Sequence, residues 1–173
     1  MLRITTFLLL SLLAVTTLRA DPLTIGAPAP DLTAADQNGV PIHFADIYAK
    51  GITLVYFYPK AGTSGCTAEA CSLRDAYDKL QAEGLQIIGV SRDTSAAQKD
   101  FQDKYKLPFT LVADTDGKVA AAFGVPMIMH VIPLASRQSF IVKDGKIAWT
   151  SLHAKTNGSA DEVQKALDGL KGP

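Results

Sequence analysis

The 173-residue sequence contains only two cysteines, one tryptophan and three histidines, and its basic and acidic residues balance. This balance, without any block of basic residues, argues against nucleic acid and anionic membranes as partners. The histidines (His43, His130 and His153) are scattered, so we expect no metal site and no cofactor. The sequence also lacks internal repeats, low-complexity tracts and interdomain linkers. These absences leave one folded domain whose chemistry depends on few residues.

The first 20 residues have the pattern of a secretory signal peptide. Arg3 supplies a positive charge, residues 7–15 form an apolar stretch too short to span a bilayer comfortably, and Ala20 is a small residue at a plausible cleavage point. An uncleaved anchor is the alternative. We therefore expect residues 21–173 to form the mature domain, without a membrane span. We expect that domain to be exported, to the periplasm of a bacterium.

Both cysteines follow a strongly apolar run. Residues 52–58 are predicted to form the central buried strand, which stops at Pro59, and residues 60–65 a turn. A helix is predicted from Cys66 to about residue 83, with Gly84 as its stop. Unpaired amide groups and the helix dipole favour an anion at such a helix start. For a cysteine placed there, the favoured anion is its own thiolate.

The helical period places Cys66 on the face that should pack against the sheet. The core-facing stripe expected at 3.6 residues per turn consists of Cys66, Ala70, Leu73, Tyr77 and Leu80. Cys66 is therefore expected in a concave corner between strand and helix.

The spacing of Cys66 and Cys71 bears on whether they can form a disulfide. In an intact helix, Cα atoms five residues apart are separated by roughly 8–9 Å, whereas a disulfide needs less than about 7 Å. A bond between them therefore requires the first helical turns to unwind. A structural disulfide is the usual expectation for an exported protein. A bond that closes so short a loop is better suited to redox turnover than to stabilisation.

The remaining segments alternate between strand and helix patterns. Asn38-Gly39 predicts a β-hairpin within residues 31–44. Further strands are predicted at 85–90, 109–113, 139–142 and 147–151, the last two as a hairpin, and helices at 95–105, 119–123 and 160–170. The expected helix caps are Asp93 or Thr94 and Asn157 or Ser159. This order predicts an α/β fold with a central mixed β-sheet flanked by helices and an N-terminal β-hairpin.

The residues around the cysteines resemble those of peroxiredoxins. Pro59, Thr63 and Cys66 stand in the pattern P-x3-T-x2-C, and Arg137, within Arg-Gln-Ser-Phe-Ile-Val, looks like the second signature of that family. The C-x4-C spacing of Cys66 and Cys71 is similar to that of the peroxiredoxin Q (bacterioferritin comigratory protein) subgroup. The resemblance covers about residues 24–170. It implies a thioredoxin-like fold and an AhpC/TSA-like thiol peroxidase.

The resemblance also implies a role for each of these five residues. Cys66 would attack a peroxide as thiolate and become a sulfenic acid. Arg137 and the amide groups at the helix start would stabilise the developing charge. Thr63 would orient the peroxide, and Pro59 would shield the sulfur from water. Cys71 would form an intramolecular disulfide with Cys66, which a thioredoxin-like dithiol reductant would reduce in an atypical 2-Cys cycle. An internal resolving cysteine also implies a monomer.

Two features depart from the subgroup. Ser64 stands where the subgroup often has proline, and residues 126–135 (PMIMHVIPLA) lack its usual charged, glycine-bearing look. Simpler roles also compete for three of the site residues. Pro59 could merely end a strand, Thr63 could be only a helix N-cap, and Arg137 could form a surface salt bridge.

Three other functions compete with the peroxidase. The first is an exported thiol–disulfide oxidoreductase, which usually shows C-x-x-C and a proline where this chain has Arg137. The second is a copper chaperone of the Sco type, whose usual spacing is C-x3-C and for which His130 is the only candidate third ligand. The third is a disulfide-stapled binding domain without catalysis. Replacement of Cys66 separates them, because a stapled binder would lose mainly stability.

Overall fold

The computed structural model describes residues 22–128 and 133–172. The signal peptide expected at residues 1–20, and the centre of the apolar stretch with His130, lie outside these residues. The elements, in chain order, are β1 (Thr33–Asp36), β2 (Pro41–His43), α1 (Phe44–Tyr48), β3 (Ile52–Phe57), α2 (Ser64–Asp75), α3 (Tyr77–Ala82), β4 (Leu85–Ser91), α4 (Ser95–Tyr105), β5 (Thr110–Ala113), α5 (Lys118–Ala122), β6 (Gln138–Lys143), β7 (Lys146–Ser151) and α6 (Ser159–Leu170).

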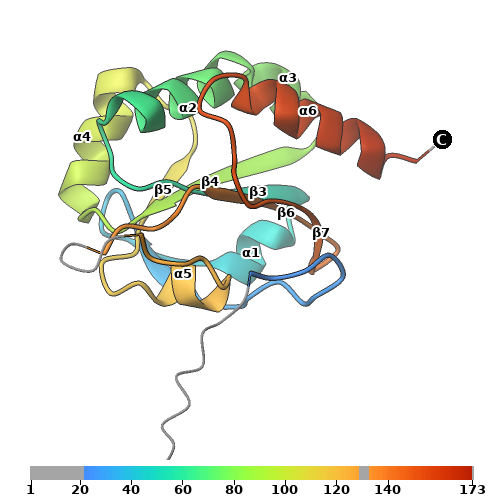
Figure 1. The fold of residues 1–173 in the computed structure, drawn as a ribbon, viewed down its shortest axis with the longest axis horizontal. Coiled ribbons are helices and arrows are strands. Elements are labelled where there is room, and N and C mark those ends of the chain that lie inside the picture. Colours follow the sequence, from blue (N-terminus) through green and yellow to red (C-terminus); the bar gives the residue numbers. More distant parts are fainter. Residues whose placement is uncertain (1–21, 129–132, 173) are drawn as a thin grey trace, which may run out of the picture.

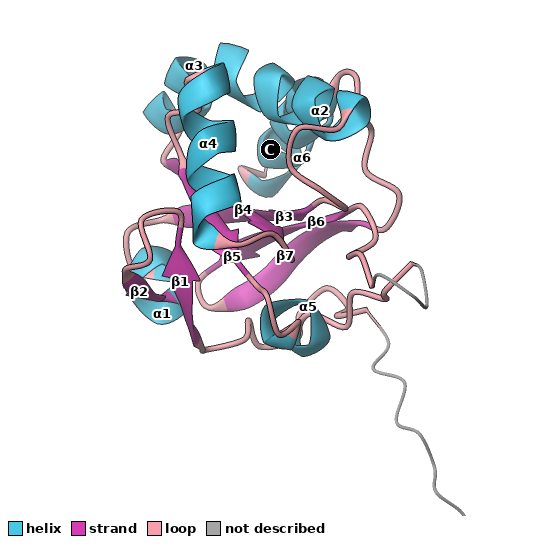
Figure 2. Cartoon of the chain, turned by 90° about the vertical axis from the view of Figure 1, so that its left-hand side faces the viewer, coloured by secondary structure: helices cyan, strands magenta, loops and turns pink. Residues whose placement is uncertain are grey.

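The described strands form one seven-stranded mixed sheet with the order β2-β1-β5-β4-β3-β6-β7. The pairs β3–β4 and β4–β5 are parallel, and the other neighbours are antiparallel. Figure 1 shows α2, α3, α4 and α6 on one face of this sheet and α1 and α5 on the other. Figure 2, turned by a quarter, shows the same three layers. The predicted α/β architecture is confirmed.

Strand β3 is central because its two sets of alternating side chains enter two different cores. Leu54 and Tyr56 pack beneath the face that carries α2, α3, α4 and α6. Val55 and Phe57 belong to the second core, on the side of α1 and α5. A strand covered on both faces needs a continuous apolar run, and the apolar run of residues 52–58 was the basis for predicting this buried strand.

The two predicted hairpins are present. In the first, the Asp36 carboxylate accepts hydrogen bonds from the backbone N–H groups of Asn38 (2.7 Å) and Val40 (2.9 Å), while Gly39 adopts a positive φ of 78°. Such a turn suits Asn-Gly because a residue without a Cβ tolerates positive φ. The second hairpin turns at Asp144 and Gly145, with φ of 52° and 71°, and pairs Lys143 with Lys146.

The helix that carries the cysteines differs from its prediction at both ends. It begins at Ser64, so that Cys66 lies within its first turn rather than at its opening residue. It also breaks at Ala76 (φ −98°, ψ 1°), which separates α2 from α3. After the break, Tyr77 contacts Phe109 with ring centroids 6.1 Å apart. A segment whose periodicity predicts one continuous helix is therefore divided into two.

The helix caps were only partly predictable. Thr94 caps α4 by accepting a hydrogen bond from the Ala97 N–H at 3.3 Å, which settles the choice between Asp93 and Thr94. The prediction for α6 was wrong, because Gly158 occupies the N-cap position with φ 76°. The N–H of Ala160 in the first turn of α6 instead donates to Ser72 Oγ of α2 at 3.1 Å. A distant side chain thus replaces the local cap.

Two further segments go beyond the predictions. The five-residue helix α1 was not expected; its Phe44 side chain is fully buried. The described flanks of the apolar stretch pair with each other, since Ser136 N–H donates to Pro126 O and Ile128 N–H to Leu134 O. The Ile128 side chain is 44% exposed. The described flanks, residues 126–128 and 133–135, therefore lie side by side, and the second leads to Arg137.

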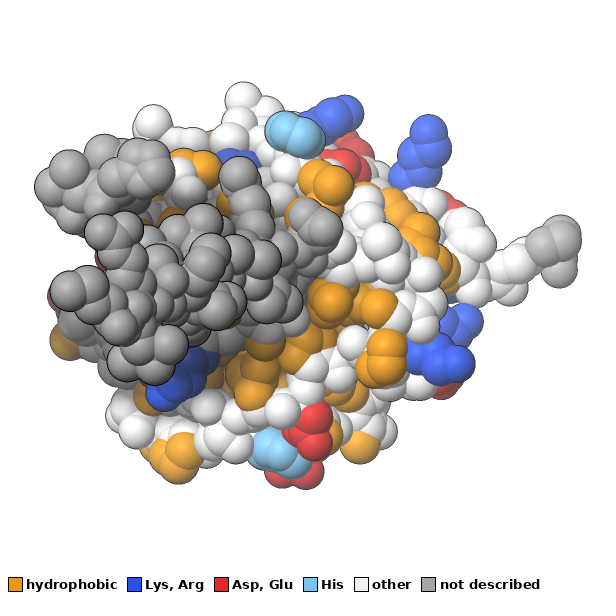
Figure 3. Space-filling view, turned by 60° about the horizontal axis from the view of Figure 1, so that its bottom comes forward, with side chains coloured by type: hydrophobic (Ala, Val, Ile, Leu, Met, Phe, Trp, Pro, Cys, Tyr) orange, Lys and Arg blue, Asp and Glu red, His pale blue; other side chains and the backbone are white. Residues whose placement is uncertain are grey.

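Figure 3 views the molecule from the side of α1 and α5. Hydrophobic side chains lie near the middle of this view, and basic and acidic side chains are interspersed toward its rim. No helix within the described part of the chain combines the length and the apolar character needed to cross a membrane.

Candidate active site

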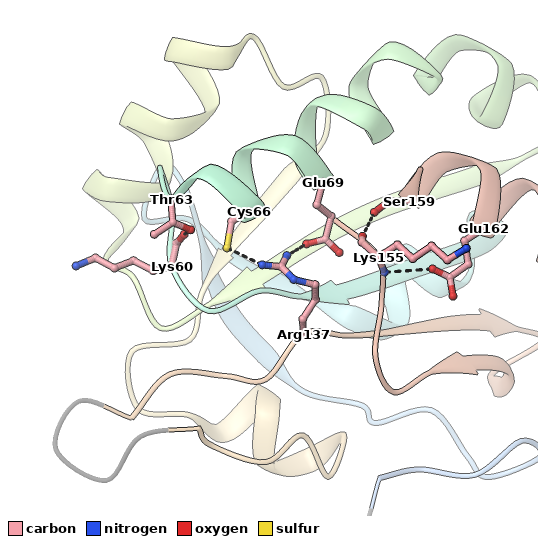
Figure 4. Close-up of polar contacts among 8 residues, drawn as sticks. All are labelled: Lys60, Thr63, Cys66, Glu69, Arg137, Lys155, Ser159 and Glu162. Carbon is pink, nitrogen blue, oxygen red and sulfur yellow. Dashed lines mark hydrogen bonds and ion pairs between the residues drawn. The ribbon is translucent and has the colours of Figure 1, made fainter. Parts of the chain in front are cut away.

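Strand pairing explains why Arg137 meets Cys66. Strands β3 and β6 are antiparallel neighbours, and Phe57 at the end of β3 pairs with Gln138 at the start of β6. Arg137 precedes β6, so it lies beside the place where the chain leaves the sheet toward α2. Figure 4 shows its guanidinium pointing at the first turns of α2.

Cys66 is buried with 1% of its surface exposed, and its sulfur accepts a hydrogen bond from Arg137 Nη2 at 3.2 Å. The first intrahelical bond of α2 runs from the Thr67 N–H to Thr63 O, at 2.8 Å. The Cys66 N–H therefore belongs to the first-turn groups that have no acceptor within the helix. Both a guanidinium and a helix N-terminus favour the thiolate form of the sulfur.

A glycine next to Cys66 permits this close arrangement. A Cβ on Gly65 would lie 3.2 Å from Thr156 Cγ2 and 3.5 Å from Arg137 Nη2. The first of these distances is tighter than ordinary van der Waals contact, so a larger residue would displace Thr156 or Arg137. Gly65 thus lets the loop before α6 and the arginine both approach the start of α2.

Glu69 is a site residue that the sequence reasoning missed. Its carboxylate forms an ion pair with Arg137 Nη1 while only 1% of its side chain is exposed, against 17% for Arg137. Burial raises the pKa of Glu69 to about 8, although Arg137 opposes the rise. Burial lowers the pKa of Arg137, but Glu69 and Cys66 together outweigh it and the net change is upward. The sequence held one signal for Glu69: a residue three positions after Cys66 lies on the same face of a helix as Cys66.

Thr63 occupies the N-cap position of α2 with an extended backbone (φ −74°, ψ 153°), but its side chain does not form the cap hydrogen bond. Its hydroxyl donates to Lys60 O at 3.0 Å. Because the hydroxyl proton is used inside the loop, the oxygen is left as an acceptor. Figure 4 places Thr63 and Cys66 close together, at the start of the same helix.

Pro59 comes two residues after the end of β3 and lines a cavity of about 250 Å³. Pro133 and Leu134, on the returning arm of the apolar stretch, line the same cavity. The segment that departs from the peroxiredoxin Q pattern therefore borders the loop between β3 and α2.

Cys71 lies in the same helix but in different surroundings. It is partly exposed, and both cysteines are free thiols within the unbroken α2. The hydrogen bond to Asp75 is the main cause that raises the pKa of the neighbouring Arg74, and Cys71 adds to it. Since helix geometry keeps residues five apart beyond disulfide reach, the structure corresponds to the reduced form.

The described histidines do not gather around the cysteines. His43 Nε2 lies 2.8 Å from an oxygen of Asp31, on the hairpin side of the molecule. Within residues 22–128 and 133–172, no group of three or more His, Cys, Asp or Glu side chains is placed to hold a metal ion.

Comparisons with known proteins agree on one family. A model of the AhpC/TSA family matches residues 25–150. The chain is 36% identical over 151 residues to chloroplastic peroxiredoxin Q of Sedum lineare, covering 86% of this chain and 80% of that protein. It is 43% identical over 123 residues to chloroplastic peroxiredoxin Q of Arabidopsis thaliana, covering 70% of this chain and only 56% of that longer protein.

Solved structures with a similar fold carry related names. Peroxidoxin BcpB of Mycobacterium tuberculosis superimposes with a TM-score of 0.79 at 28% identity, covering 84% of this chain and 97% of that chain. The bacterioferritin comigratory protein of Xanthomonas campestris, described in connection with alkyl peroxide reduction, gives a TM-score of 0.75 at 26% identity, covering 85% and 99%. The fold is therefore the thioredoxin-like fold of peroxiredoxins. On the family match, these relatives and this fold, the chain belongs to the AhpC/TSA family of peroxiredoxins and is similar to its Q subgroup.

Proposed function

We propose that this chain is a thiol-dependent peroxidase that reduces hydrogen peroxide or organic hydroperoxides through Cys66 and Cys71. The observation that carries the proposal is the 3.2 Å hydrogen bond from Arg137 to the buried sulfur of Cys66 at the start of α2. The thiolate attacks the terminal peroxide oxygen, the O–O bond breaks, and the sulfur becomes a sulfenic acid. The departing oxygen takes up a proton and leaves as water or an alcohol.

The surrounding groups act on this step in different ways. Arg137 and the first-turn amide groups stabilise negative charge, first on sulfur and then on the departing oxygen. The Thr63 oxygen, whose proton is given to Lys60 O, accepts a hydrogen bond from the peroxide O–H and so aligns it. Pro59 contributes an apolar wall that limits water around the sulfur.

The second step joins the two cysteines. The Cys71 thiol attacks the sulfenic sulfur, water leaves, and a Cys66–Cys71 disulfide forms. Because both residues start within one helix, the turns between them must unwind first. A thioredoxin-like dithiol then reduces the disulfide and becomes oxidised itself.

Substrate range, location and assembly are further parts of the proposal. The alkyl peroxide reduction named for the Xanthomonas campestris relative, together with the apolar arm beside Pro59, supports organic hydroperoxides as substrates. The pattern of residues 1–20 supports export to a periplasm. The internal resolving cysteine supports a monomer. N-terminal sequencing after expression in a bacterium tests the export, and light scattering tests the monomer.

The test of function is the intact mass of the reduced protein after one equivalent of hydrogen peroxide. We expect a rapid loss of two hydrogen atoms in the wild type. In the Cys71→Ser variant, we expect a dimedone adduct on Cys66, because its sulfenic acid has no internal partner. An unchanged mass after several minutes would refute the peroxidase.

The remaining alternatives are less well supported. The relatives and solved structures are peroxiredoxins rather than C-x-x-C oxidoreductases or copper chaperones. If the mass of the protein does not change with peroxide but the protein binds one equivalent of copper(I), the copper-binding alternative is supported instead.

A further inference from the structure

The loop of residues 59–63 carries both Pro59 and Thr63, and Ala61 at its centre packs partly against the core. Lys60, Gly62 and Thr63 are exposed, and Gly62 has a positive φ of 76°. The hydrogen bond from Thr63 to Lys60 O lies within the loop and cannot anchor it to the rest of the molecule. The loop therefore needs an external attachment if Thr63 and the start of α2 are to stay in place.

That attachment comes from Asp93, which follows strand β4. Its Oδ2 accepts a hydrogen bond from the Ala61 N–H at 2.7 Å. A carboxylate bound to a backbone N–H forms one of the stronger protein hydrogen bonds. Asp93 is free for this contact because the cap of α4 is supplied by Thr94. Among the described residues, Asp93 forms no ion pair.

A buried chain of polar side chains holds Asp93 itself. The Ser91 hydroxyl donates to Asp93 Oδ2 at 2.7 Å, and Gln98 Nε2 donates to Ser91 Oγ at 2.9 Å. Gln98 is fully buried and receives a hydrogen bond from the Tyr58 hydroxyl, one residue before the loop. The hydrogen-bond network thus connects Tyr58, before the loop, to Ala61, within it, through Gln98 of α4 and through Ser91 and Asp93.

We propose, on the basis of the peroxidase function above, that Asp93 is a positioning residue for the loop of residues 59–63 and acts through the Ala61 N–H. With this bond, the loop holds Thr63 and the first turn of α2 in the geometry that attack on peroxide requires. Without it, the loop samples other conformations, and the first step slows. The second step requires α2 to open, so release of the loop leaves disulfide formation unchanged or accelerates it.

The test measures the two steps separately in Asp93→Ala and Asp93→Asn. In the Asp93→Ala variant, we expect the rate constant of sulfenic acid formation to fall about 10-fold, the order of magnitude for loss of a hydrogen bond to a charged group. The rate of disulfide formation should not fall. Asp93→Asn should restore most of the first step, because its amide oxygen can still accept from Ala61.

Asp100→Ala is the matched control. Asp100 lines a cavity with Ala61 and Gly62, and among the described residues it makes no hydrogen bond to the loop. The substitution removes a negative charge near the same loop but leaves the hydrogen bond to Ala61 intact. Both steps should therefore keep their wild-type rates. An Asp93→Ala variant with an unchanged first step, or with both steps slowed alike, would overturn the proposal.

Hydrogen–deuterium exchange provides a readout that does not depend on peroxidase activity. We expect faster exchange at residues 61–67 in Asp93→Ala, with Asp93→Asn and Asp100→Ala close to the wild type. If Asp93→Ala fails to fold, Ser91→Ala tests the same network. This substitution keeps the Asp93 carboxylate but removes the Ser91 hydroxyl that orients it. Unchanged exchange in the folded variant would refute the positioning role even if the protein proves not to be a peroxidase.

Discussion

The two cysteines lie five residues apart in one helix, and their surroundings differ in almost every respect. Cys66 is buried, at the helix start, and hydrogen-bonded to an arginine that also pairs with buried Glu69. Cys71 is partly exposed, one helical turn further on, beside the surface pair Arg74–Asp75. The first environment buries the sulfur and places it within hydrogen-bond distance of Arg137, whereas the second leaves the sulfur accessible to solvent. The difference indicates a division of labour, with the intact helix keeping the two thiols apart.

Removal of Cys66 should have the largest effect. Cys66→Ser is expected to abolish peroxide consumption, because a serine hydroxyl neither ionises near neutral pH nor forms the sulfenic acid. A coupled assay with a dithiol reductant measures the loss. Substantial residual turnover would show that the buried site is not the reactive one.

Removal of Cys71 should separate the two halves of the cycle. Cys71→Ser is expected to consume one equivalent of peroxide at the wild-type rate and then stop, because the disulfide that the dithiol reduces cannot form. Stopped-flow measurement of the first turnover and a steady-state assay check this together. Equal steady-state rates for the variant and the wild type would refute Cys71 as the resolving residue.

Replacement of Arg137 should weaken activation without removing the reactive sulfur. Arg137→Ala is expected to slow the first step on the order of 100-fold, as for loss of a group that stabilises developing charge. Stopped-flow measurement of sulfenic acid formation checks this. Arg74→Ala, which removes an arginine beside Cys71, is the control and should change the first step little. An unchanged first step in Arg137→Ala would favour a structural role.

Glu69 should affect the pH dependence of stability more than the chemistry. Its pKa rises from 4.5 in the unfolded chain to about 8 in the fold, so the folded state binds more protons between these values. Stability should therefore fall as the pH rises through this window, by at most about 1.4 kcal/mol per pH unit. Denaturant melts of Glu69→Gln should show a shallower fall than the wild type.

The control for this effect is Glu83→Gln. A hydrogen bond from Lys171 is the main cause that lowers the pKa of the partly buried Glu83, so its contribution is lost only at more acidic pH. This variant should keep the wild-type slope between pH 5 and 8. Equal slopes in all three proteins would contradict the role assigned to the burial of Glu69.

The sequence was sufficient for the strands of the sheet and for the contact at the centre of the site. The apolar run of β3 and the hairpin residues predicted the sheet, and the signatures around Cys66 and Arg137 predicted two residues that the structure brings within hydrogen-bond distance. Both succeed because local patterns encode them. The strand pairing that joins them was implied by the fold rather than by either motif.

The features that escaped prediction depend on contacts between distant segments. Glu69 becomes a site residue only because Arg137 arrives from β6. The sequence suggested Asp93 only as a possible cap, whereas in the fold it accepts a hydrogen bond from Ala61, in the loop after the neighbouring strand β3. The helix also breaks at Ala76, and Tyr77 after the break contacts Phe109 from the segment before β5. The periodicity of a local sequence contains no information about any of these contacts.

The hydrogen bond from the Ala160 N–H to Ser72 Oγ links α6 to the helix that carries both cysteines. Ser72 is the residue directly after Cys71, and Ala160 lies in the first turn of α6. Thermodynamic linkage makes such a contact reciprocal: whatever opens α2 at Cys71 weakens the attachment of α6, and whatever loosens α6 favours the opening of α2. In the proposed second step, the packing of α6 against α2 therefore opposes the opening of α2 and disfavours the form in which the two thiols can meet.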